Sequence, residues 1–69
     1  MIEIFKTNVT TDLQVQEITA LLIGKYPACR INFDLQDCDK ILRVKSDVDL
    51  KSNIINLMRH AGFECEQLA

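Results

Sequence analysis

The feature that most constrains the fold of this sequence is a change of hydrophobic period within residues 2–26. Residues 2–6 (IEIFK) alternate with a period of two and are rich in β-forming types, which predicts a strand. Further on, apolar side chains recur at steps of three and four, which predicts a helix. The expected core side chains of this helix are Val15, Ile18, Leu21, Leu22 and Tyr26. On the strand, we expect Ile2 and Ile4 to face the core and Glu3 and Phe5 to face away from it.

The turn between this strand and helix carries the residue types that begin a helix. Thr11 and Gln14 have the spacing of a capping box, in which the hydroxyl accepts from a backbone amide and the amide side chain reaches back. Asp12 lies in the first turn, where a carboxylate suits the positive end of the helix dipole. Helix initiation therefore explains these residues without a ligand.

The remaining residues predict two more strands, a second helix and a short last strand. Residues 29–35 alternate apolar and polar side chains, residues 36–40 form a polar hairpin tip, and residues 41–45 form the partner strand. The second helix has its core stripe at Leu50, Ile54, Leu57, Met58 and Ala61. The order β-α-β-β-α-β predicts a single α+β domain over residues 1–69, with a ferredoxin-like sandwich of a four-stranded antiparallel sheet and two helices on one face.

This topology predicts one polar face and one polar pole. The face opposite the helices is expected to carry a mixture of charges, with Phe5 as its only apolar spot. Its predicted residues are Glu3, Phe5, Arg30, Asn32, Arg43, Lys45, Glu64 and Glu66. We expect residues 7–12, 36–40 and 60–63 to meet at the pole where the first two strands and the second helix end.

Composition limits the classes of function. The 69 residues carry a net charge of −2, with eight basic and ten acidic side chains, which argues against a nucleic-acid or anionic-membrane partner. No apolar run approaches the roughly 20 residues needed to span a bilayer, and no signal segment opens the chain. Three cysteines are an odd and widely spaced set, which favours reduced thiols. We expect a cytoplasmic protein that is a monomer or a weak homodimer.

At the level of element order and length, the chain resembles the heavy-metal-associated domains of copper chaperones and metal-transporting ATPases. The corner Ala61-Gly62-Phe63 is similar to the Ala-Gly-Tyr/Phe of that family. The family's Met-x-Cys-x-x-Cys metal motif falls on residues 9–14, where Thr11 and Gln14 replace the two cysteines. A hydroxyl and a carboxamide do not replace the thiolates that Cu(I) requires. The resemblance thus implies the scaffold without its metal site, and we expect no cofactor.

Other metal or catalytic sites are weaker hypotheses. Cys29 and Cys65 share parity with inward residues, so we expect both in the core. Cys38 at the hairpin tip and His60 at the end of the second helix form an alternative metal site at the polar pole, although their spacing matches no zinc motif. The same pair is a poor enzyme site, because a nucleophile needs a cleft and an orienting group. We therefore predict that the protein is not an enzyme.

The leading functional hypothesis is a protein-interaction or adaptor module. Its expected contact residues lie on the first loop or on the open face of the sheet. They are Phe5, Asn8, Val9, Thr10, Thr11 and Asp12. The alternatives are a metal-binding or metal-trafficking protein with the relocated Cys38/His60 site, and a small-ligand regulatory domain that acts as a dimer.

Overall fold

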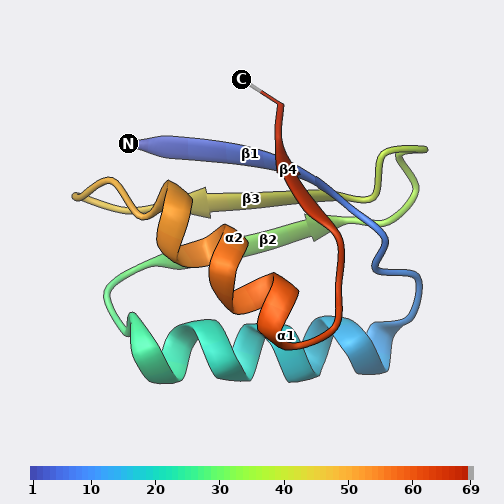
Figure 1. The fold of residues 1–69 in the computed structure, drawn as a ribbon, viewed down its shortest axis with the longest axis horizontal. Helices are drawn as coiled ribbons and strands as arrows, with labels where there is room; N and C mark the ends of the chain where they lie inside the picture. The colour runs from blue at the N-terminus through green and yellow to red at the C-terminus, as the bar shows by residue number, and fades with distance from the viewer. Residues whose placement is uncertain (69) are drawn as a thin grey trace.

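The computed structural model describes residues 1–68, which form six elements around one sheet (Figure 1). The elements are β1 (Ile2–Thr7), α1 (Asp12–Lys25), β2 (Arg30–Asp34), β3 (Ile41–Lys45), α2 (Lys51–His60) and β4 (Cys65–Gln67). The strands are antiparallel in the order β2-β3-β1-β4, and both helices cover the same face of the sheet (Figure 1). The predicted ferredoxin-like arrangement is therefore confirmed. No helix within residues 1–68 is long and apolar enough to cross a membrane.

Cross-strand pairing determines which side chains share a face of the sheet. Directly opposed residues of antiparallel strands point to the same side. Phe5 on β1 lies opposite Leu42 on β3, which in turn lies opposite Phe33 on β2. Phe5 and Leu42 are fully buried, so this row faces the helices. Arg43, the next residue on β3, is exposed and faces the opposite side.

The orientation of β1 differs from the expectation by one residue. Phe5 is fully buried in the core, whereas Ile2 is 62% exposed and Ile4 is only half-buried. The prediction that the two isoleucines face the core and that Phe5 lies on the open face is therefore wrong. Period-two alternation shows that alternate residues share a face, but it does not show which of the two faces is covered.

Hydrogen bonds to polar side chains stabilise this orientation of β1. The hydroxyl of Thr7 donates to the carbonyl of Lys40 at 2.6 Å. The carboxylate of Glu3, which is 9% exposed, accepts from Nε2 of Gln67 at 2.6 Å. A buried polar group costs little when it is hydrogen-bonded, so burying Glu3 and Thr7 is compatible with burying the ring of Phe5 between them.

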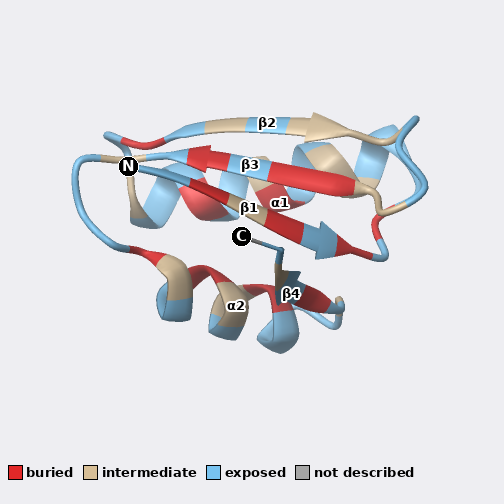
Figure 2. Cartoon of the chain, turned by 90° about the horizontal axis from the view of Figure 1, so that it is seen from above, coloured by how far each residue is buried: buried red, intermediate tan, exposed pale blue. Residues whose placement is uncertain are grey.

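The two helices supply the other half of the core. Ile18 and Leu22 on α1 and Ile54 and Met58 on α2 are fully buried, as their spacing predicts. Figure 2 colours the buried parts of both helices red. Leu21 is 51% exposed, so its assignment to the core stripe is wrong. The i, i+3, i+4 pattern admits both Leu21 and Leu22, but adjacent helical residues point about 100° apart and only one of them can face the sheet.

Glycine ends the second helix as expected. Gly62 has φ +93°, a conformation that glycine adopts without strain. The backbone amide of Phe63 donates to the carbonyl of Met58 at 2.9 Å across this turn. The chain thus reverses direction and enters β4 along the edge of β1.

The expected loop pole forms in part, around the loop that follows β1. The amide of Thr7 donates to the carbonyl of Asp39 at 3.1 Å, which joins the end of β1 to the β2–β3 hairpin. The amide of Glu64, just after the α2–β4 corner, donates to Oδ1 of Asn8 at 2.9 Å. These polar groups of the pole are therefore hydrogen-bonded to one another, which leaves them less available to a ligand.

Candidate functional site

The loop between β1 and α1 ends in the predicted capping box. Oγ1 of Thr11 accepts from the amide of Gln14 at 3.1 Å. Oε1 of Gln14 accepts in return from the amides of Thr11 at 3.3 Å and Thr10 at 2.9 Å. The two side chains that the resemblance to heavy-metal-associated domains would align with metal ligands are therefore engaged in starting the helix.

Two of the six expected contact residues offer no surface to a partner. Phe5 and Val9 are both fully buried in the core. Asn8 is exposed, but its side chain accepts the hydrogen bond from Glu64. Thr10, Thr11 and Asp12 are exposed at the start of α1. The loop therefore presents few free side chains, and its apolar member points inward.

The structure does not bring Cys38 and His60 together. Cys38 is exposed at the β2–β3 hairpin, while His60 is exposed at the C-terminal end of α2. These two segments lie far apart in Figure 1, with the hairpin at the upper right and the end of α2 beside α1 below. Nδ1 of His60 lies 3.0 Å from the carbonyl oxygen of Asn56 within its own helix. Sequence reasoning assigned both residues to one pole, which is too coarse to establish proximity.

Cys38 instead has two neighbouring carboxylates. Ligand atoms of Asp37, Cys38 and Asp39 all lie within 4.8 Å of one another. Oδ1 of Asp37 accepts from the amide of Asp39 at 2.9 Å, and Oδ1 of Asp39 lies 3.8 Å from Nζ of Lys6. Turn formation and this ion pair account for both carboxylates.

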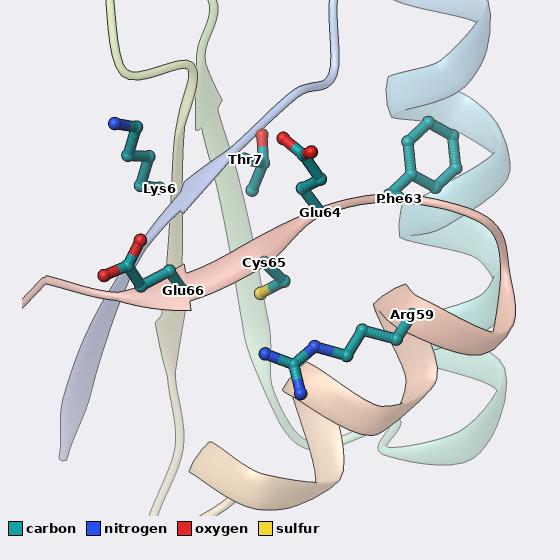
Figure 3. Close-up of a pocket in the computed structure, with 7 residues that line it drawn as sticks. All are labelled: Lys6, Thr7, Arg59, Phe63, Glu64, Cys65 and Glu66. Carbon is teal, nitrogen blue, oxygen red and sulfur yellow. The ribbon is translucent and has the colours of Figure 1, made fainter.

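The other two thiols are buried, as expected. Burial raises the pKa of Cys29, and a backbone hydrogen bond partly lowers it. Burial raises the pKa of Cys65 to about 11, and the nearby charge of Arg59 lowers it in part. Cys65 lies at a surface depression of about 430 Å³ between β1, β4 and α2 (Figure 3). Its thiol stays protonated at neutral pH, so this depression lacks a thiolate nucleophile.

The raised pKa of Cys65 predicts a loss of stability at alkaline pH. The folded state keeps the thiol proton up to about pH 11, whereas an unfolded thiol releases it near 9.0. The contribution of this thiol to stability is therefore full below about pH 9 and is lost as the pH rises towards 11. Urea unfolding between pH 8 and 11 measures the slope. The Cys65→Ala variant should show a shallower slope, and an unchanged slope would contradict the prediction.

The open face of the sheet carries a group of uncompensated cations. Arg30, Arg43 and Lys45 are all exposed, and none of them forms an ion pair with residues 1–68, whose one ion pair joins Lys6 to Asp39. Arg30 lies directly opposite Lys45 on the neighbouring strand. Like charges in that position are destabilising.

Exposed and half-buried isoleucines lie beside these cations. Both isoleucines are on β1, the other neighbour of β3. Ile2 lies opposite Lys45, and Ile4 lies opposite Arg43. A shallow depression of about 190 Å³ lies among Ile2, Arg30, Arg43 and Lys45. We call Ile2, Ile4, Arg30, Arg43 and Lys45 the basic face; Figure 2 views the sheet from this side, with α1 behind it.

The sequence predicts a mixed face, and the basic face differs from it at β1. The two sides of β1 are exchanged relative to the prediction. The four expected β2 and β3 residues (Arg30, Asn32, Arg43, Lys45) are exposed as predicted. Glu3, however, faces the helices, and isoleucines take its place and that of Phe5. One acidic and one aromatic side chain are thereby exchanged for aliphatic ones, which leaves the cations without a neighbouring carboxylate on β1.

Comparison with known proteins returns no relative. The sequence matches no family model, no curated protein and no solved structure. The resemblance to heavy-metal-associated domains therefore stays a prediction, and any function has to be argued from the surface itself.

Proposed function

We propose that this chain is a cytoplasmic protein-interaction module, built on a heavy-metal-associated type of scaffold without the metal-binding cysteines. Its basic face binds an acidic peptide segment of a partner protein that also carries aliphatic side chains. The observation that carries the proposal is the group of Arg30, Arg43 and Lys45, exposed beside Ile2 and without a counter-ion in residues 1–68.

The energetics of the basic face favour an anionic partner. The opposed pair Arg30 and Lys45 destabilises the free sheet, and a carboxylate placed between them relieves that repulsion. Arginine forms paired hydrogen bonds with a carboxylate, which adds directional specificity. Ile2 and Ile4 supply apolar surface whose burial adds about 25 cal/mol per Å². Charge and apolar area thus favour the same kind of ligand.

A peptide fits the basic face better than a nucleic acid does. Proteins that bind single-stranded RNA on a sheet stack bases on exposed aromatic rings. Phe5 is fully buried, and Phe33 shares the helix-covered side of the sheet with Leu42. Within residues 1–68, the open face therefore presents aliphatic rather than aromatic side chains to a ligand.

A binding role also agrees better with the chemistry of the other sites than metal transfer or catalysis does. Thr11 and Gln14 are occupied in the capping box. Cys38 and His60 lie in different segments, and Cys65 has a raised pKa. None of these groups provides a thiolate pair or an activated nucleophile.

The proposal is tested by following amide chemical shifts while adding a 12-residue peptide of alternating Glu and Leu. We expect saturable shifts on residues 2–4, 30–32 and 43–45 that weaken at high salt. The double variant Arg43→Glu, Lys45→Glu should reduce the affinity at least tenfold. The matched control Lys25→Glu, Lys51→Glu changes the net charge equally but lies on the helices, and it should bind nearly as well as the wild type.

Two results would overturn this proposal. One is an equal loss of affinity in both double variants, which would reduce the effect to overall charge. The other is tighter binding of a single-stranded oligonucleotide of the same charge as the peptide, with shifts at the same residues.

A further inference from the structure

We propose that two copies of this chain associate through β2, in antiparallel register centred on Asn32. β2 is an outer strand in the order β2-β3-β1-β4, and no other segment of residues 1–68 lies beside its free edge (Figure 2). The outward backbone amides and carbonyls of an edge strand are ready to pair with another strand. A second copy of β2 supplies them with partners.

The sequence of β2 is complementary to itself. The strand reads Arg30-Ile31-Asn32-Phe33-Asp34, with opposite charges two residues on either side of the centre. Antiparallel pairing about Asn32 sets Arg30 of each copy opposite Asp34 of the other. Two ion pairs form across the strands, and a two-fold interface of this kind uses the same patch on both copies. A register shifted by two residues forms neither pair.

The free copy lacks these charge partners. Arg30 forms no ion pair within residues 1–68 and faces Lys45 across β3. Asp34 accepts one hydrogen bond, from the amide of Gln36 at 3.2 Å, and its carboxylate retains further acceptor capacity. An ion pair between Arg30 and Asp34 of the second copy offsets the repulsion between Arg30 and Lys45 within one copy.

The apolar residues of β2 point to the same contact. Ile31 and Phe33 are half-buried, whereas Val44 and Leu42, directly opposite them on β3, are 1% and 0% exposed. In the proposed register, Ile31 of one copy lies opposite Phe33 of the other on the helix-covered side. Each aromatic–aliphatic pair covers apolar surface that the single copy leaves open.

The resulting dimer has one continuous sheet of eight strands. Its two-fold axis passes between the two Asn32 residues, perpendicular to the sheet, so all four helices lie on one side and both basic faces on the other. The contact involves five residues per copy, so the dimer is weak and forms at high protein concentration. The dimer engages Arg30 of the basic face and leaves Arg43 and Lys45 free, so its formation does not require the proposed peptide binding.

Sedimentation equilibrium of charge-reversal variants tests the proposed register. The wild-type chain should shift from monomer towards dimer as its concentration rises from about 10 μM to 1 mM, which spans dissociation constants between the micromolar and millimolar ranges. Arg30→Asp alone and Asp34→Arg alone should each be monomeric over this range. An equimolar mixture of the two should form heterodimers, because acidic and basic residues then oppose each other at both positions. The double variant Arg30→Asp, Asp34→Arg should dimerise like the wild type.

Controls separate this contact from the basic face and from misfolding. Arg43→Ala, which leaves Arg30 and the opposed Lys45 in place, should leave dimerisation unchanged, and the amide spectrum of each variant reports its fold. A wild-type chain that stays monomeric at 1 mM would overturn the proposal. So would a folded pair of single variants that does not associate on mixing, or dimers whose concentration-dependent shifts lie away from residues 30–34.

Discussion

Replacement of Phe5 by alanine is expected to lower the free energy of unfolding by about 3–5 kcal/mol, because it removes a fully buried ring from the centre of the sheet. A chain of 69 residues has a total stability of roughly 3–10 kcal/mol. Phe5→Ala should therefore leave a substantial unfolded population at 25 °C. Urea unfolding followed by circular dichroism measures the loss as a shift of the midpoint to lower denaturant.

The same strand provides the matched control. Ile2 is 62% exposed on the opposite face, and Ile2→Ala should cost less than about 1 kcal/mol. The ratio of the two effects reports which face of β1 is covered, even if the absolute stability differs from the value given above. A larger loss from Ile2→Ala than from Phe5→Ala would show that β1 has the opposite orientation.

The sequence predicted β1 as a strand but did not determine which of its two faces is buried. Alternation identified the strand, and the prediction placed Ile2 and Ile4 inside and Phe5 outside. Alternation alone does not include the hydrogen bonds that allow Glu3 and Thr7 to be buried. Their partners, Gln67 and Lys40, lie 64 and 33 positions further along the chain. Long-range partners of this kind have no local signature.

Features that depend only on neighbouring residues in the sequence were predicted correctly. The capping box of Thr11 and Gln14 and the glycine turn at Gly62 each depend on a few consecutive residues, and both are present. The basic face depends instead on the pairing of three strands. The sequence predicted the exposure of Arg30, Arg43 and Lys45, but it assigned Glu3 to the same surface. The inverted strand removed Glu3 from the predicted face and placed isoleucines beside the cations, while Glu66, opposite Lys6, stays on the open face as predicted.

The second large effect is expected from restoring a cysteine pair at the start of α1. In the double variant Thr11→Cys, Gln14→Cys, two thiols occupy the N-cap and the third helical position, which the capping bonds already hold close together. Thiolates are favoured at a helix N-terminus, and Cu(I) prefers sulfur ligands. We expect Cu(I) binding to appear in a chain whose own residues at these positions are poor ligands. Loss of the cap should cost about 1 kcal/mol of stability.

The titration is made in a Cys38→Ser background, because Cys38 is the exposed native thiol and would otherwise compete for copper. Cys29 and Cys65 are buried in the core and stay in place. The single variants Thr11→Cys and Gln14→Cys are the controls, since one thiolate should bind Cu(I) far more weakly than two.

Binding that requires both cysteines would support a scaffold related to the heavy-metal-associated domains, in which helix capping has replaced metal ligation. A folded double variant that binds no better than either single one would show that the loop backbone, held by Thr7, Asn8 and the buried Val9, cannot present two ligands to one ion. The resemblance would then be limited to the order of strands and helices.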